Sequence, residues 1–232
     1  MRSESISRSW WIGIAAVIAI LGLGGCASEK SRTVDTPTVT SAGTSYAGER
    51  QPISIGRFTN NSPYMRGLFS EGDDRLGNQA RTILKTHLSN TNRFRVLDRE
   101  NLSMIEQENQ LSGVSSQIQG ASVLLTGQVT EFGRRTTGDK QLFGILGRGK
   151  KQLAYSKVSI NVVDTRTTEV IHSVQGAGEY TLSNREVLGF GSTAEYDATL
   201  NGKVLNLSIT DAVNKLVSDL ESGKWNAGDD RG

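Results

Sequence analysis

The chain contains a single cysteine, Cys26, so no disulfide can hold the fold together and apolar side chains must form its core. This cysteine follows an uncharged run of fourteen residues, Trp10 to Leu23, which two arginines precede. At about 1.5 Å per residue, a helix of that length spans roughly 21 Å, less than the roughly 30 Å hydrocarbon core of a bilayer. A basic start, an apolar core and small residues before a cleavage point are typical of a secretory signal peptide. We therefore expect residues 1–25 to be removed.

The residues around the cysteine, Leu23-Gly24-Gly25-Cys26, resemble the bacterial lipobox. The resemblance implies cleavage before Cys26 and acylation of both its thiol and its new amino group. The alternative is an ordinary signal peptide with a chance cysteine. Ala27 and Ser28 follow, without the aspartate at position 27 that is the usual signal for retention in the inner membrane. We expect a lipid-anchored protein of the outer membrane whose domain faces the periplasm.

Composition excludes several kinds of chemistry. With Cys26 lipidated, no thiol remains for a nucleophile or a thiolate metal site, and His87 and His172 are the only histidines. A formal charge of +2 is too close to neutral to favour nucleic acid as a partner. Gly144 to Lys151 imitates a phosphate-binding loop but ends in lysine instead of serine or threonine. We expect no enzyme activity, no metal and no cofactor beyond the covalent lipid.

Removing the signal peptide leaves 207 residues (232 − 25), enough for one ordinary domain and a tail or for two small domains. Residues 26–51 are poor in large apolar side chains and predict a lipidated N-terminus with a flexible tether. The folded domain is expected over 52–225, with a short tail over 226–232. Between Thr59 and Gly72 the pattern predicts a loop that is unusual in holding several apolar residues.

Apolar periodicity predicts an α+β or α/β sandwich. We predict strands over 53–58, 94–97, 121–132, 152–165 and 170–182. We predict helices over 73–89, from a cap at Asp98 to about Leu111, and over about 209–220. In the second helix, Leu102 and Ile105 are expected to face the core. The alternating residues Ala154, Val158, Ile160 and Val162 are expected on one side of their strand.

Two stretches, about 133–151 and 178–196, do not fit a compact sandwich. The second alternates apolar and polar residues in two arms around a turn predicted at Asn184-Arg185-Glu186. That pattern is typical of a membrane-spanning β-hairpin that lines a wet pore, and a hairpin half-buried on its own domain is the alternative. The expected membrane-facing residues are Phe143, Ile145, Tyr180, Leu182, Leu188, Phe190 and Tyr196. One hairpin leaves unpaired backbone edges in lipid, so insertion would require a ring of copies.

Several segments resemble the CsgG/HfaB family, over about residues 52–225. Phe94–Leu102 (FRVLDRENL) resembles its strand-to-helix signature, and Leu124–Gly133 (LLTGQVTEFG) is similar to its central strand. Phe143-Gly144-Ile145 resembles the tip of its first membrane hairpin. Val158–Ile171 (VSINVVDTRTTEVI) resembles a further hairpin, with the family's glycine replaced, and Ser222–Trp225 resembles the end of its last helix.

The resemblance implies an outer-membrane secretion channel, built as a ring in which each subunit donates two hairpins to a shared β-barrel and periplasmic α/β domains form a vestibule. It implies a constriction by the loop after the first strand, for which Tyr64, Phe69 and Ser70 are the nearest candidates. The implied partners are other copies, outer-membrane lipid, an unfolded curli-like or adhesive polypeptide and periplasmic accessory proteins.

A non-pore lipoprotein with the same fold is the alternative, either an activator of cell-wall synthases or an anchor for surface structures. An activator needs a long tether to cross the peptidoglycan. The predicted tether of about 25 residues reaches only roughly 28 Å as a flexible coil. That short reach favours a domain close to the membrane.

Overall fold

A five-stranded mixed sheet organises the computed structural model, which describes residues 36–64, 74–115, 117–140, 148–186 and 200–226. The strand order is β2-β1-β3-β4-β5. β1 pairs in parallel with both β2 and β3, whereas β3, β4 and β5 form an antiparallel meander. The strands are β1 (Gln51–Asn60), β2 (Phe94–Leu97), β3 (Val123–Lys140), β4 (Arg148–Asp164) and β5 (Val170–Glu186).

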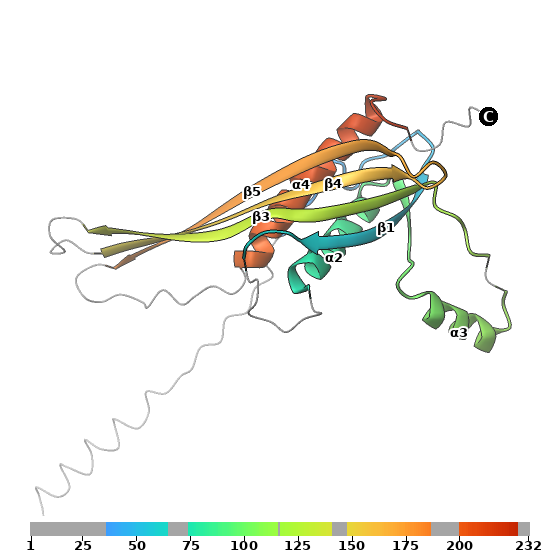
Figure 1. Ribbon diagram of the computed structural model, residues 1–232, viewed down its shortest axis with the longest axis horizontal. Coiled ribbons are helices and arrows are strands. Elements are labelled where there is room, and N and C mark those ends of the chain that lie inside the picture. Colours follow the sequence, from blue (N-terminus) through green and yellow to red (C-terminus); the bar gives the residue numbers. More distant parts are fainter. Residues whose placement is uncertain (1–35, 65–73, 116, 141–147, 187–199, 227–232) are drawn as a thin grey trace, which may run out of the picture. The chain divides into compact units, whose positions relative to one another are not determined.

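Three helices complete the described fold: α2 (Arg75–Asn90), α3 (Leu102–Ser112) and α4 (Leu200–Glu221). α2 and α4 pack on each other and on the same face of the sheet, as Figure 1 shows. Their apolar stripes, including Leu84 and Ile209, are fully buried against Leu125 and Ile160 of the sheet. The mixed α/β class predicted from the periodicity is confirmed, and so is the buried side of β4.

Two glycines of β5 allow α4 to approach the sheet closely. A Cβ atom at Gly176 would collide with the carbonyl oxygen of Ser208 and the backbone nitrogen of Ala212. A Cβ atom at Gly178 would come within 2.7 Å of both Cβ of Leu207 and the backbone nitrogen of Ser208. Because these atoms belong to the helix backbone or lie next to it, they cannot rotate away, and the two glycines determine how closely α4 packs.

Replacing Gly176 by alanine is therefore expected to lower the free energy of unfolding by about 1–3 kcal/mol, the usual range for an overpacked core. Urea denaturation of the mature chain measures this value. The neighbouring Ala177 is exposed and points to the opposite face, so Ala177→Ser is the matched control and should change stability by less than about 0.5 kcal/mol. Equal stability of the wild type and Gly176→Ala would contradict the close approach.

The prediction of a flexible tether up to residue 51 is wrong for its second half. The compact unit that contains the sheet begins at Thr36. Within it, Val39 is 2% exposed and Ala42 packs against the core. We call residues Thr36–Tyr46 the N-terminal strap. Its polar residues bond to α4 and to Arg93, and no apolar pattern in the sequence indicates these contacts.

The prediction for α3 is also wrong in two respects. Asp98 does not cap the helix; the N-cap is Asn101, whose side chain makes no capping bond. Asp98 instead accepts hydrogen bonds from Lys85 of α2 and from the backbone of Glu100. No residue of α3 is buried, so Leu102 and Ile105 do not face the core.

The turn predicted at residues 184–186 is replaced by strand. These residues belong to β5 and pair with Arg148–Lys150 of β4. The first residues of β4 provide the pairing partner, so the alternating pattern continues instead of reversing. Figure 1 shows the far ends of β3, β4 and β5 running out together beyond α2 and α4.

Candidate functional site

The first turns of α4 collect side chains from three separate parts of the chain. Asn201 donates from Nδ2 toward the Tyr64 hydroxyl at 3.5 Å, and its Oδ1 accepts from Nε of Arg134 at 2.9 Å. The Lys203 ammonium lies 5.2 Å from the ring centre of Tyr180. We call these five residues the root cluster. It joins the loop after β1 to the points where β3 and β5 leave the helix-covered part of the sheet.

Tyr64 is held firmly in this cluster. Its ring lies 4.8 Å from the ring of Phe132, tilted by 49°, and its carbonyl accepts from Nδ2 of Asn60 at 3.2 Å. Its role at a constriction stays a prediction. The other two predicted constriction residues, Phe69 and Ser70, lie outside the described residues.

The residues predicted to face a membrane are only partly described. Tyr180 packs against the core, which matches the alternative of a hairpin half-buried on its own domain. Leu182 lies further along β5. The remaining predicted residues, Phe143, Ile145, Leu188, Phe190 and Tyr196, lie outside the described residues, as does the lipidation candidate Cys26.

The N-terminal strap meets α4 close to the root cluster, which the sequence did not indicate. Nδ2 of Asn206 donates to the carbonyl of Pro37 at 3.0 Å, and Oδ1 of Asn206 lies 2.7 Å from Nε2 of the buried His87. Further along the helix, Oδ1 of Asn214 accepts from Thr40. Asn206 follows Asn201 by five residues, which is about 7.5 Å along a helix. The strap therefore enters the domain beside the root cluster.

The second histidine belongs to a separate structural contact. Nε2 of His172 lies 3.0 Å from Asp219, and its ring stacks 6.1 Å from the ring of Trp225. A hydrogen bond from Lys224, supported by one from His172, holds the pKa of Asp219 below its ordinary value. Both histidines thus contact side chains of α4.

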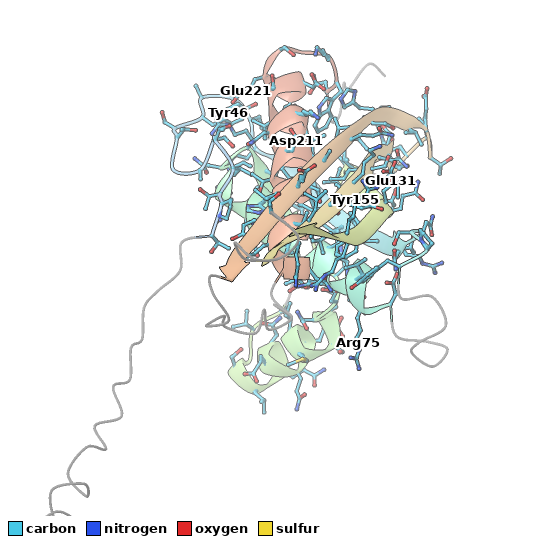
Figure 2. The ribbon with its side chains drawn as sticks, turned by 90° about the vertical axis from the view of Figure 1, so that its left-hand side faces the viewer. Tyr46, Arg75, Glu131, Tyr155, Asp211 and Glu221 are labelled. Carbon is cyan, nitrogen blue, oxygen red and sulfur yellow. The ribbon has the colours of Figure 1, made fainter. Side chains whose placement is uncertain are left out.

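The sheet face opposite the helices is polar over β3, β4 and β5. Nζ of Lys157 lies 2.6 Å from Glu131, and Tyr155 lies across Gly133, where a Cβ atom would collide with its ring. Glu131, Tyr155, Lys157 and Glu179 line a shallow hollow of about 270 Å³. Figure 2 shows Glu131 and Tyr155 side by side on this face.

The start of α3 is tied to α2 by Asp98. Nζ of Lys85 lies 2.8 Å from the Asp98 carboxylate, and this hydrogen bond, with others from Asn101 and the backbone of Glu100, lowers the pKa of Asp98 to about 2. Arg81 and Glu100 form a second ion pair between the same segments.

The low pKa of Asp98 makes a pH-dependent contribution to stability. An unfolded aspartate titrates near 3.9, so the ionised carboxylate stabilises the fold above that pH, and this stabilisation is lost as the pH falls through about 2. After allowance for solvent screening, we expect Asp98→Asn to lower the free energy of unfolding by about 1 kcal/mol at pH 7 and by about half as much at pH 3. Guanidinium denaturation at both pH values measures this. An equal difference at pH 7 and pH 3 would exclude the charge as its source.

The described part of the chain lacks two features that would point to other functions. No helix there combines the length and apolar character needed to cross a bilayer. No group of three or more histidine, cysteine, aspartate or glutamate residues there is arranged to hold a metal ion.

Comparison with known proteins supports the resemblance seen in the sequence. The family model "Curli production assembly/transport component CsgG" matches residues 37–229. The chain is 55% identical over 212 residues to "Putative lipoprotein NMB1126/NMB1164" of Neisseria meningitidis serogroup B, an alignment that covers 91% of this chain and 95% of that protein.

Similarity to solved structures is weaker. A "putative neuraminyllactose-binding hemagglutinin homolog" from Helicobacter pylori aligns with a TM-score of 0.44 and 12% identity, over 83% of this chain and 92% of that one. The C-terminal domain of LpoB from Salmonella enterica aligns with a TM-score of 0.31 and 17% identity, over 56% of this chain and 85% of that one. Both scores lie below 0.5.

Proposed function

Because the chain belongs to the CsgG family, we propose that it is an outer-membrane lipoprotein whose copies form a ring-shaped channel. Each copy contributes two hairpins, about 133–151 and 178–196, to one shared β-barrel, and we call the strands of these hairpins the strand extensions. The α/β domains stand in the periplasm as a vestibule. The channel exports, or assembles at the surface, unfolded polypeptides of the curli-like or adhesive kind.

The observation that carries this proposal is that β3, β5 and the N-terminal strap all contact the first turns of α4. Arg134 and Tyr180 mark where β3 and β5 leave the helix-covered sheet, and both contact α4 there. Pro37 of the strap bonds to Asn206 on the next turns of the same helix. The strand extensions and the incoming chain from Cys26 therefore lie at the same end of the domain.

The chain between Cys26 and the strap is short enough for the lipid and the strand extensions to enter the same membrane. Ten residues lie between Cys26 and Pro37, and these eleven residue-to-residue steps span at most about 36–40 Å when fully extended and about 18 Å as a flexible coil. This reach is shorter than the one estimated for a tether of 25 residues. A lipid on Cys26 holds the root cluster close to the bilayer that the extensions would enter.

The pairing of the extensions favours a ring over a single inserted copy. Among the described residues, β3 beyond Val129 and β5 along its whole length pair only with β4. Two open edges remain, and unpaired backbone groups cost several kcal/mol each in hydrocarbon. Identical neighbours that pair edge to edge around an axis remove both edges.

In such a ring, the loop that starts at Tyr64 repeats once per subunit around the axis. Its predicted constriction residues are Tyr64, Phe69 and Ser70. A ring of aromatic and small polar side chains would pass an extended chain and exclude folded proteins. Transport would follow diffusion and chain entropy, since the outer membrane offers no ATP.

The test is single-channel conductance of the lipidated protein, extracted in detergent and inserted in planar bilayers, with the mass of the particle measured by native mass spectrometry. We expect a ring of several subunits with a steady conductance. Phe69→Ala should raise that conductance, whereas Glu179→Gln, on the polar sheet face, should leave it unchanged.

A monomer without conductance would contradict the channel. The alternative of a non-pore tethered lipoprotein, either a cell-wall synthase activator or a surface-structure anchor, would then explain the family membership. A ring that forms but does not conduct would favour the anchor over the channel.

A further inference from the structure

The outer edge of β5 is partly covered by two side chains of α4. β5 is the last strand of the sheet, and among the described residues β4 is its only strand partner. The N–H of Ala177 donates to Oδ2 of Asp211 at 3.0 Å, and Nζ of Lys215 donates to the carbonyl of Gln175 at 2.9 Å. Asp211 and Lys215 also form an ion pair at 2.8 Å. We call these two side chains the edge clamp, and Figure 2 shows Asp211 on α4 beside β5.

The edge clamp takes the place of one residue of a neighbouring strand. Gln175 and Ala177 are two residues apart, so their backbone groups point to the same side of the strand. A partner strand would bond these two groups with one N–H and one carbonyl. The Lys215 ammonium replaces that N–H, and the Asp211 carboxylate replaces that carbonyl. A strand can therefore add at this position only by displacing both side chains, and charged side chains are a common means of protecting a sheet edge.

The close packing of α4 brings the edge clamp within reach of β5. Asp211 and Lys215 are four residues apart, so they lie on the same side of the helix. Gly176 lies between the two bonded residues of β5, and it is one of the two glycines that permit the close approach of the helix backbone. The Asp211 and Lys215 side chains are 38% and 52% exposed. Because both charges stay in contact with water, covering the edge costs little desolvation.

The other edge of the meander is covered to nearly the same row of residues. Along β3, that edge pairs with β1 as far as Val129, whose partner is Asn60. The N–H of Asn61 then donates to the Val129 carbonyl at 2.9 Å. Across β4, Val129 lies in the same row as Gly176, next to the clamped residue Ala177. Both edges are therefore covered where α4 packs on the sheet, and the strand extensions begin within a few residues beyond this row.

We propose that the edge clamp prevents a strand of a second copy from pairing with the helix-covered part of β5, and so limits pairing between copies to the strand extension beyond Ala177. The pairing beyond Ala177 rests on the proposed ring, whereas the blocked edge before it does not. Without the clamp, β5 would accept a further copy at a second position. A contact of that kind does not close into the same ring, and contacts that do not close produce open assemblies.

The test is native mass spectrometry of the full lipidated chain in detergent, with far-ultraviolet circular dichroism as the check of folding. We expect D211A with K215A to keep the wild-type circular dichroism. Part of this variant should shift to masses above the wild-type particle, and that part should grow with protein concentration. The reason is that both backbone groups of the edge become available to a strand of another copy.

Three further variants identify the cause of the shift. D211N with K215R keeps one acceptor and one donor and should keep the wild-type mass. D211K with K215D keeps an ion pair but exchanges the acceptor and the donor, so it should shift as the alanine variant does. A177P added to D211A with K215A removes the N–H that an added strand would need. It removes no bond to β4, because this N–H points to α4, and proline is tolerated at such edge positions, so it should restore the wild-type mass.

The matched charge control is E131A with K157A. This variant removes an exposed ion pair of the same kind that lies on the polar sheet face and not at the edge. It should give the wild-type mass at every concentration.

A wild-type mass for D211A with K215A at every concentration would overturn the proposal. So would larger masses that A177P does not suppress, because the copies would then meet elsewhere. If the alanine variant lost its circular dichroism, D211K with K215D would decide the question in its place. Failure of the channel gives a different result, since a monomeric wild type without conductance contradicts the ring, while larger masses in the clamp variants would still support the blocked edge.

Discussion

Replacing Arg93 by methionine is expected to lower the free energy of unfolding by about 3–4 kcal/mol and to release the N-terminal strap. The Arg93 side chain is only 8% exposed. Its Nη1 lies within hydrogen-bond distance of the carbonyls of Ser41, Thr44 and Thr91 and of the Thr44 hydroxyl. Leaving three partly or fully buried carbonyls without this donor costs about 1 kcal/mol or more each.

The same guanidinium connects the strap to the C-terminal ends of both helices that cover the sheet, at Thr91 after α2 and at Glu221 of α4. Nε and Nη2 donate to Glu221 at the end of α4, at 2.8 and 2.7 Å, and the Tyr46 ring lies 5.1 Å away. Figure 2 shows Tyr46 and Glu221 close together on one side of the fold. Methionine fills much of the volume but donates no hydrogen bond, so the strap would lose its polar attachment while the apolar core is kept.

Guanidinium denaturation gives the stability change, and limited proteolysis between residues 36 and 50 reports release of the strap. Lys157→Met is the matched control, because it removes an ion pair whose two side chains are both well exposed, and such pairs contribute about 0–1 kcal/mol. If Arg93→Met and Lys157→Met had equal effects and the strap stayed protected, the strap would be held by Val39 and not by Arg93.

The strap is a part of the described fold that the sequence did not predict. The helices and strands that bury apolar stripes were predicted, because α2, α4 and the shared face of β4 repeat apolar residues at 3.6 or 2 residues per period. The strap has one fully buried apolar side chain, Val39, and otherwise depends on hydrogen bonds to Arg93, Asn206 and Asn214. Those partners lie 49 or more residues away in the chain, and no local pattern identifies them.

The other errors have related causes. The periodicity of α3 was recognised, but periodicity does not say whether the domain itself supplies the covering surface, and α3 remains uncovered. Alternation along β5 could not distinguish a turn at residues 184–186 from a longer strand, because that choice depends on the length of β4. Of the candidate site, Tyr64 and Tyr180 were selected from the sequence, and their meeting at α4 through Asn201 and Lys203 emerged only from the fold.

Replacing Trp225 by alanine is expected to have the largest effect of all, a loss of about 3–5 kcal/mol in the free energy of unfolding. Trp225 is 4% exposed although it lies four residues beyond the end of α4. Its ring stacks 6.2 Å from Phe94 and 6.1 Å from His172, and its Nε1 donates to the carbonyl of Leu216 at 3.2 Å. It therefore joins the first edge strand, the last strand and the last helix.

The conservative variant separates ring packing from the hydrogen bond. Trp225→Phe keeps most of the buried aromatic surface and loses only the Nε1 donor, so it should cost about 1–2 kcal/mol, well below the alanine variant. Trp225 is the only tryptophan after Trp11, so its fluorescence in a chain that begins at Cys26 should be blue-shifted and should change in a single step with the circular dichroism during urea denaturation. If the tryptophan signal changed first, the segment after α4 would unfold separately from the sheet, and Trp225 could not connect β2, β5 and α4 in one cooperative core.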